Sequence, residues 1–534
     1  MIPREVLSTA ALRVACQRFS DGQIAPALDK YTGPTYIERD DISRVLDAFM
    51  EADQPALVIA GDVGVGKTNL LVHFYQHTLL TQPDLLPLWF DGASLSTERS
   101  LARTILLACN QYVALDPILA VQSEANRALS NLLYDTLKRE TLVLVIDGAN
   151  ENDLPMEVFR VINDFIVEFP AIDYVKLIVT TRPQIWKYAR TGRLRKRYKS
   201  HKYFSKLPDA LNQTALRVEN DSFVLTRYND AELATAFEKY TAFYNVVDPD
   251  LARLSESLRR VIREPLLLRL TCTAHHHKRI PPDMQGDSIV SRLISSMVDD
   301  SQGSLRAVDL AFLRRWLMPQ FFPPAAPPVA RLTREMLKHA ALDSGTLDDQ
   351  VMQVIRAGDY DLVDSSVQRL IRSGWLLLKT SLDDYELRFC YEYFYDDFGG
   401  SYLMDQYQRS AERVAWFDKL ITDSQSAAFL WGALRTFIIN LLKNGEYDFI
   451  AWLGNTTNLY QYELVRDVLT DYYQYYPAYR AGLHRLLLSW LAEASGQSPT
   501  FAVSIAASVS AANPLQAEDI LLRMMIHPDE PIRL

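Results

Sequence analysis

The chain has 534 residues, and at roughly 150 residues per domain this length predicts about three or four compact units. Hydrophobic residues make up 48% and charged residues 23% of the sequence, a mixture typical of folded proteins that excludes a disordered or fibrous chain. The net charge of −10, from 56 basic and 66 acidic residues, argues against a protein that coats nucleic acid along its whole length.

The compartment is predicted from three features. The four cysteines (Cys16, Cys109, Cys272 and Cys390) lie far apart without metal-type spacing, so a reducing compartment is expected. The N-terminus mixes charges early and lacks the apolar core of a signal peptide. The most apolar segment, 427–442, contains charged and amide side chains and is shorter than the roughly 20 residues that a bilayer requires. We therefore expect a buried helix there, and a cytoplasmic protein with no membrane partner.

The first half of the chain predicts an α/β domain. Residues 1–33 form a weakly patterned lead-in, and a helix is predicted to begin within 36–41 because Ile42, Val45, Leu46 and Phe49 recur at helical spacing. Apolar runs then alternate with helical stretches; the runs are 56–60, 86–90, 142–146 and 175–179. Continuous apolar runs are typical of strands buried on both faces. Residues 34–228 are therefore predicted to form a parallel sheet with helices on both faces.

The second half of the chain is predicted to be mostly helical. Residues 229–318 form a helical domain, and the proline cluster in 319–330 indicates a linker because proline restrains the residue before it. Within 331–403 a helix at 367–373 is followed by two candidate strands, 375–379 and 385–389, an order typical of a winged helix. Residues 404–534 read as helices, and their last segment resembles the edge of a HEAT-type repeat, although no clean period is present.

The decisive motif is G-x-x-x-x-G-K-[ST], present as residues 61–68 between a predicted strand and a predicted helix. Phosphate oxygens need several backbone N–H groups aimed at one point, and glycines let the loop wrap that closely. Lys67 would bring positive charge to the outer phosphates, and Thr68 a hydroxyl to Mg²⁺. The motif therefore predicts an ATP or ADP site, with Mg²⁺, formed by Gly61, Gly64, Val65, Gly66, Lys67, Thr68 and Asn69.

Two further strand ends complete the predicted site. Asp147 follows the run 142–146 and is predicted to hold Mg²⁺ through water, while Glu151 could orient or deprotonate the attacking water. Arg182 follows the run 175–179, where it could sense the terminal phosphate by charge-assisted hydrogen bonds. The alternatives are a helix cap at Asp147 and a surface arginine in a turn set by Pro183. The predicted catalytic residues are thus Lys67, Asp147, Glu151 and Arg182.

The order of these motifs resembles the STAND class of P-loop NTPases, particularly its NACHT and NB-ARC branches. Their acidic Asp-Gly-x-Asp-Glu strand end is similar to 147–151, and their Thr/Ser-Arg-Pro sensor to 180–183. Residues 264–268 are similar to the family motif whose proline touches adenine, which implies that role for Pro265. By position, the resemblance implies adenine-side roles for Tyr36, Ile37 and Arg39. Residues 373–376 and 398–403 resemble the winged helix and its closing helix, so the likeness spans 36–403.

Two positions depart from the family pattern. Asn150 stands where the family usually has aspartate, which implies slow hydrolysis, with binding and exchange carrying the signal. Many members present a winged-helix histidine to the ADP phosphate, and Tyr391 stands at that position here, beside Cys390.

The resemblance implies an ATP-dependent switch in signalling or antiphage defence. ADP would bridge the domains of a closed monomer, and an unidentified trigger, expected to be a protein, would permit ATP exchange and self-association. Two alternatives stay open: an initiator-like AAA+ ATPase that binds duplex DNA, and a nucleotide-bound scaffold in which hydrolysis is vestigial. The DNA alternative would use the winged helix and residues 187–206, which carry nine basic and no acidic side chains. We favour a solvated or oligomer-contacting role for that run because the chain as a whole is acidic.

Overall fold

A computed structural model gives the fold of most of the chain. It describes residues 9–109, 122–136, 140–152, 154–169, 172–191, 218–219, 222–282, 306–323, 326–342, 345–357, 365–373, 375–381, 384–424, 428–454, 459–475, 480–492 and 502–505. The chain divides into two compact units, Met1–Gly303 and Ser304–Leu534. The basic run beyond residue 191 and the HEAT-like segment at the C-terminus lie outside the described residues.

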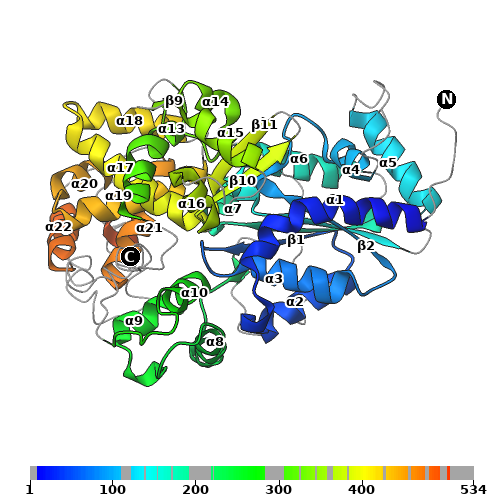
Figure 1. Ribbon diagram of the computed structural model, residues 1–534, viewed down its shortest axis with the longest axis horizontal. Coiled ribbons are helices and arrows are strands. Elements are labelled where there is room, and N and C mark those ends of the chain that lie inside the picture. The colour runs from blue at the N-terminus through cyan, green and yellow to red at the C-terminus, as the bar shows by residue number, and fades with distance from the viewer. Residues whose placement is uncertain are drawn as a thin grey trace. The chain divides into compact units, whose positions relative to one another are not determined.

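The first unit is built on a six-stranded sheet in the order β2-β3-β4-β1-β6-β5. Its strands are β1 (Ala56–Gly61), β2 (Leu85–Asp91), β3 (Thr141–Asp147), β4 (Val175–Thr181), β5 (Val218–Glu219) and β6 (Ser222–Leu225). Strands β1 and β2 of this sheet are labelled in Figure 1. All neighbouring strands are parallel apart from the β5–β6 pair. Every residue of β1 and β4 is buried, as continuous apolar runs require. The four predicted strands and the predicted α/β class are confirmed.

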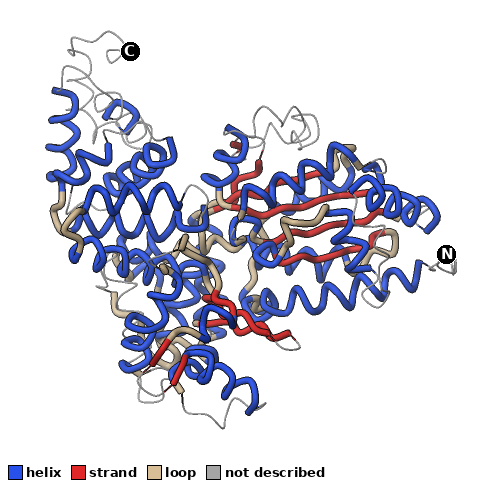
Figure 2. The backbone as a smooth tube through the Cα atoms, turned by 90° about the horizontal axis from the view of Figure 1, so that it is seen from above, coloured by secondary structure: helices blue, strands red, loops and turns tan. Residues whose placement is uncertain are grey.

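Helices lie on both sides of this sheet (Figure 2). They are α1 (Thr9–Lys30), α2 (Asp40–Glu51), α3 (Lys67–Phe74), α4 (Leu101–Cys109), α5 (Gln122–Thr136), α6 (Pro155–Glu168) and α7 (Pro183–Thr191). Apolar side chains of α1, α2 and α3 share one core with alternate residues of the strands, such as Leu57, Ile59, Val143 and Val145. This alternation follows from the two-residue period of a strand. The helix that carries Lys67 is thereby packed firmly against the sheet.

The N-terminal segment differs from its expected form as a weakly patterned lead-in. Residues 9–30 form α1, which packs along β2 and also contacts α3 and α4. Its buried positions are Leu12, Cys16, Ser20, Ile24 and Ala27. These positions have helical spacing, but three of the five side chains are small, so the apolar stripe is faint in the sequence. Ser20 Oγ accepts a hydrogen bond from the backbone N–H of Trp89 in β2 at 2.9 Å.

The end of the first unit is helical, as predicted. It contains α8 (Asp230–Phe243), α9 (Glu256–Val261) and α10 (Pro265–Ala274). Asn229 and Glu232 form a reciprocal capping box at the start of α8, which accounts for a helix beginning immediately after β6 and its loop. The short strand β6 was not predicted, because four residues are too few for a periodic signal.

The second unit contains the predicted helix and β-hairpin. Helix α16 (Ser366–Arg372) precedes the antiparallel strands β10 (Leu376–Ser381) and β11 (Asp384–Phe389), and β7 (Leu332–Thr333) completes a three-stranded sheet. The other elements here are α12 (Ala307–Phe312), α13 (Met318–Phe321), α14 (Arg334–Lys338), α15 (Leu347–Ala357) and the small pair β8 (Ala341–Leu342) and β9 (Gly345–Thr346). Helices α12 and α13 contact α16 and α17 (Glu392–Arg409). Residues 306–318 therefore belong to the second unit, whereas the sequence assigned them to the helical domain; the other domain limits stay predictions.

Further helices follow α17 in the described part of the chain. They include α18 (Arg413–Ser424), α19 (Trp431–Lys443), α20 (Tyr447–Gly454), α21 (Leu459–Tyr475) and α22 (Arg480–Ala492). Two glycines let α17 and α19 approach closely, because a Cβ at Gly400 would lie 2.5 Å from Cβ of Thr436 and one at Gly399 would lie 3.0 Å from Cβ of Ala433. Helix α19 is largely buried, as expected for the apolar segment. Within the described ranges, no helix combines the length and apolarity needed to cross a bilayer.

A buried ion pair joins α12 to α16 in the second unit. Arg369 Nη2 lies 2.6 Å from Oδ1 of Asp309, a carboxylate with no solvent exposure. Burial alone would raise the pKa of Asp309, but hydrogen bonds from Arg369, Ser366 and the Arg306 backbone hold that pKa below its ordinary value. The pair therefore stabilises the fold above the pKa of an unfolded aspartate, and this stabilisation is lost as the pH falls through the lower folded-state pKa.

Replacing Arg369 with methionine is expected to lower the free energy of unfolding by about 3–5 kcal/mol, because Asp309 is left buried without its cation. Thermal and denaturant unfolding at neutral pH would measure the loss. The control is Lys338→Met, which breaks only the exposed pair with Glu335 and should change stability by no more than about 0.5 kcal/mol. Equal effects of the two substitutions would contradict the importance of this pair.

Candidate nucleotide-binding site

The loop between β1 and α3 has the geometry that its sequence predicts. Gly64 and Gly66 have φ angles of +81° and +96°, a region that side chains disfavour, and Gly66 is the N-cap of α3. Nζ of Lys67 donates hydrogen bonds to the carbonyl oxygens of Gly61 at 2.7 Å and Asp62 at 2.9 Å. The lysine ammonium therefore lies across the loop, at the start of a helix whose first N–H groups favour anions.

Asp147, at the end of β3, interacts with β4 and with the first turn of α3. The hydroxyl of Thr180 in β4 donates to Oδ1 of Asp147 at 2.7 Å and accepts from the backbone N–H of Gly148 at 2.7 Å. The side chain of Thr68 also hydrogen-bonds to Asp147. Burial raises the pKa of Asp147, while the two threonines and the charges of Lys30 and Lys67 oppose that rise. Two predicted metal-side residues, Thr68 and Asp147, are thus brought together.

The parallel sheet, the glycine loop leading from β1 into α3, and an acidic residue at the end of β3 that interacts with the first turn of α3 occur here together. This is the fold of a P-loop NTPase. No family model and no curated protein matches the sequence.

Solved structures with which the chain shares limited similarity include three ATPases or origin recognition proteins. One is the Walker-type ATPase PABY2304 of Pyrococcus abyssi, at 13% identity over 66% of this chain and 94% of that chain, with a TM-score of 0.33. Another is the ORC2 protein of Aeropyrum pernix in ADPNP–ADP complexes, at 14% identity over 66% and 89%, with a TM-score of 0.29. A third is Drosophila ORC bound to DNA, at 11% identity over 73% and 91%, with a TM-score of 0.29.

The P-loop NTPase fold gives the Mg²⁺ prediction a physical test. Mg²⁺ prefers oxygen ligands and retains several of its waters when it is bound by proteins. The hydroxyl of Thr68 interacts with the carboxylate of Asp147, and both groups supply oxygen. The residues present therefore fit a magnesium ion held partly through water between the loop and β3.

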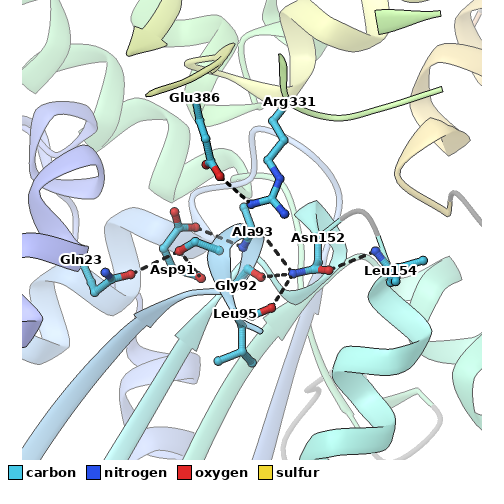
Figure 3. A network of polar contacts seen from close by, with 10 residues as sticks. Gln23, Asp91, Gly92, Ala93, Leu95, Asn152, Leu154, Arg331 and Glu386 are labelled. Carbon is cyan, nitrogen blue, oxygen red and sulfur yellow. Dashed lines mark hydrogen bonds and ion pairs between the residues drawn. The ribbon is translucent and has the colours of Figure 1, made fainter. Parts of the chain in front are cut away.

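The turn after β3 is fixed by an asparagine that the sequence did not single out (Figure 3). Nδ2 of Asn152 donates to three carbonyl oxygens of the loop after β2, those of Gly92 at 3.0 Å, Ala93 at 3.2 Å and Leu95 at 3.0 Å. Its Oδ1 accepts from the N–H of Leu154 at 3.0 Å. Asn152 therefore positions the turn that carries Glu151. A lone asparagine after an apolar run gives no sequence signal for such a role.

Three predicted residues lie on this turn or on the neighbouring strand end. Asn150 is 2% exposed, so its side chain is inside the fold. Glu151 lies against Gly148, where a Cβ would be 2.9 Å from the Glu151 carboxyl carbon, and Gly148 has a φ of +71°. Arg182 is 3% exposed and comes two residues after Thr180. Glu151 and Arg182 are therefore at the same sheet edge as Asp147, as predicted.

The predicted adenine-side segment is fastened to the helical part of the first unit. Arg39 donates from Nε to Oε1 of Glu232 at 2.9 Å and from Nη1 to the carbonyl of Thr226 at 2.9 Å. The carbonyl of Tyr36 accepts from Nζ of Lys239 at 2.8 Å. Ile37 is buried. The structure thus gives Arg39 a role in tying the segment to α8, and its adenine contact stays a prediction.

Tyr36 also contacts the helix of the phosphate loop. Its ring stacks on His73 of α3, with centroids 3.9 Å apart and an interplanar angle of 16°. Burial raises the pKa of Tyr36. The segment is consequently linked to both α3 and α8.

The predicted proline motif lies directly on the phosphate loop. The backbone N–H of Leu266 donates to the carbonyl of Gly64 at 3.0 Å. A Cβ at Gly66 would lie 3.8 Å from Cγ of Pro265. Val65 is buried, and Asn69 is partly buried in the first turn of α3. The sequence placed Pro265 near the nucleotide by resemblance, and the structure places it at the loop.

Two residues remain to be placed: Tyr391, which was predicted to bind the nucleotide, and Lys30, which was not predicted. Tyr391 belongs to the second unit, where it is the N-cap of α17 and contacts Phe394, and its predicted contact with a nucleotide stays a prediction. Lys30, at the end of α1, was not predicted; its charge acts on Asp147. Only the folding of α1 across the sheet brings Lys30 there, so no local motif could have indicated it.

The network predicts a difference between two adjacent threonines. Thr180→Val removes the hydroxyl that orients Asp147 and is expected to lower the rate of Mg²⁺-dependent ATP hydrolysis by roughly 10- to 100-fold, the usual range for a lost support of a metal ligand. Thr181 is fully buried and its hydroxyl has no hydrogen-bond partner among the described residues. Thr181→Val, the matched control, should leave the rate nearly unchanged. Steady-state phosphate release measures both, and equal rates for the two variants would refute this role of Thr180.

Proposed function

We propose that this protein is an ATP- and ADP-binding ATPase that works as a nucleotide-controlled switch. The observation that carries the proposal is the interaction of Thr68, in the first turn of α3, with Asp147, next to a glycine loop whose lysine lies across it. Such a site binds the phosphates of a nucleotide and favours a metal at their side.

Different residues of the chain would serve nucleotide binding and hydrolysis. The loop N–H groups would bind the phosphates, and Lys67 would neutralise the outer ones. Thr68 and Asp147 would hold Mg²⁺, which supplies charge neutralisation at the transferred phosphate. Glu151 would orient or deprotonate the attacking water, and Arg182 would contact the terminal phosphate. Asn150 is buried and carries no charge, so it adds no carboxylate beside Glu151, which supports slow turnover.

The contacts between the loop and α10 support the switch. Leu266 and Pro265 lie on the loop, and the segment carrying Tyr36 and Arg39 is bonded to α8. A nucleotide bound at the loop would therefore have different affinities for different positions of α8–α10. Such a difference in affinity shifts a conformational equilibrium. Together with the STAND resemblance, this supports a sensor of the signalling or antiphage type that self-associates after exchanging ADP for ATP.

An initiator-like ATPase acting on duplex DNA is the second candidate. The winged helix and its β10–β11 hairpin favour it. Two residues of α16 in the same domain are poorly placed to bind DNA. Arg369 is hydrogen-bonded to the buried carboxylate of Asp309, and Gln368 is buried. DNA contacts would then depend on Arg372, on the hairpin and on residues 187–206.

One experiment on the purified full-length protein separates the candidates. Nucleotide released by denaturation is identified by ion-exchange chromatography, and binding to a fluorescent duplex is measured at low and high salt. The switch predicts stoichiometric ADP and weak DNA binding. Salt-sensitive duplex binding that is lost when the basic side chains in 187–206 are neutralised would favour the initiator. Bound nucleotide with no turnover above that of Lys67→Ala would indicate the scaffold.

A further inference from the structure

Two buried cysteines are in contact where α1 packs on α4. Cys16 of α1 and Cys109, the last residue of α4, are 1% and 5% exposed. Their Sγ atoms lie 3.6 Å apart, although 93 positions separate the two residues in the sequence. A disulfide bond is about 2.05 Å long, so the two sulfur atoms need to approach each other by roughly 1.5 Å to form one.

Contacts on either side of Cys16 hold α1 in this place. Nη1 of Arg13 donates to the carbonyl oxygen of Leu85 at 2.8 Å, and Ser20 Oγ accepts from the N–H of Trp89 at 2.9 Å. Both partners belong to β2. The fold therefore keeps the two thiols within reach of each other, and groups that are held in contact react faster than groups that must first meet by diffusion.

We propose that Cys16 and Cys109 are a site of reversible oxidation, at which a hydroperoxide converts the two thiols of the folded protein into a disulfide bond. Hydrogen peroxide first oxidises one thiol to a sulfenic acid and releases one water. The second sulfur then attacks the sulfenic sulfur, the S–S bond forms, and the hydroxyl leaves with the remaining thiol proton as a second water. A dithiol reverses the reaction by thiol–disulfide exchange. This modification does not depend on the proposed nucleotide switch.

The surroundings of the pair keep it reduced until an oxidant is present. The hydrogen bond with Cys16, and then burial, raise the pKa of the Cys109 thiol well above its ordinary value. Because the thiolate is the reactive form, the reaction with peroxide is slow at neutral pH and faster in mildly alkaline solution. Once formed, the bond would join α1 covalently to α4 and restrict the unfolded chain by closing a long loop.

The test is peptide mapping of the full-length protein after incubation with hydrogen peroxide in mildly alkaline solution. The remaining thiols are alkylated, the protein is digested without reductant, and cross-linked peptides are identified by mass spectrometry. We expect a peptide pair joined through Cys16 and Cys109, which dithiothreitol separates. Cys16→Ala should abolish this pair. Cys272→Ala is the matched control, because Cys272 of α10 is also buried in the first unit, and it should leave the pair unchanged.

Thermal unfolding gives a second measurement on the same samples. The oxidised protein should unfold at a temperature about 5 °C or more above that of the reduced protein, because the bond closes a long loop, and Cys16→Ala should show no such rise. The proposal would be overturned if folded, oxidised protein lacked the Cys16–Cys109 pair, or if the pair formed equally well in urea-unfolded protein. It would also be overturned if the cross-linked protein unfolded no later than the reduced one, because the bond would then not fit the native packing of α1 on α4.

Discussion

Replacing Asp147 with asparagine is expected to lower Mg²⁺-dependent ATP hydrolysis by about 100-fold or more, since a bound metal contributes several kcal/mol of charge stabilisation. The substitution keeps the size of the side chain and an oxygen that can accept the hydrogen bond from Thr180. The fold should therefore survive while the charge that attracts Mg²⁺ is removed. Phosphate release at increasing Mg²⁺ concentrations measures the effect.

The matched control for this variant is Asp164→Asn. Asp164 is an aspartate of α6 that pairs with Arg160 on the helix surface, so its replacement should leave hydrolysis unchanged. ADP binding without Mg²⁺ should also persist in Asp147→Asn, because the loop is intact. Hydrolysis by Asp147→Asn at the native rate would exclude Asp147 from the metal site.

Replacing Lys67 with alanine is expected to weaken ATP binding by about 100-fold, corresponding to roughly 2.7 kcal/mol, because the charge over the loop is lost. The effect should be larger for ATP than for ADP, since the lysine of such loops reaches the outer phosphates. Isothermal titration calorimetry with each nucleotide measures the two affinities. Lys338→Ala, which removes an exposed lysine paired with Glu335, is the control. An unchanged ATP affinity in Lys67→Ala would mean that nucleotide binds elsewhere.

The sheet and the phosphate loop could be predicted from the sequence because their signals are local. Strands buried on both faces appear as continuous apolar runs, and the loop between β1 and α3 needs glycines at fixed spacing. Asp147 was predictable for the same reason, since it directly follows a buried strand. These features depend on residues close together in the chain, so one sequence is enough to indicate them.

The parts of the site that were missed depend on contacts between distant segments. Thr180, on another strand, donates a hydrogen bond to Asp147. The charge of Lys30 acts on Asp147 only because α1 folds over the sheet. The pairing of Arg39 with Glu232 joins residues 193 positions apart. Pro265 was placed near the nucleotide by resemblance, whereas the hydrogen bond from Leu266 to the Gly64 carbonyl follows from how α10 packs. Side-chain partners of this kind are set by tertiary packing, which periodicity does not encode.

The most direct test of the nucleotide-controlled switch is the mass of the protein in each nucleotide state. Light scattering on size-exclusion chromatography would compare full-length protein with Mg²⁺ and ADP against protein with Mg²⁺ and a non-hydrolysable ATP analogue. We predict a monomer with ADP and a larger, self-associated species with the ATP analogue, and no such change for Lys67→Ala. The same mass in both states, with nucleotide demonstrably bound, would contradict the claim that this P-loop NTPase is a nucleotide-controlled switch.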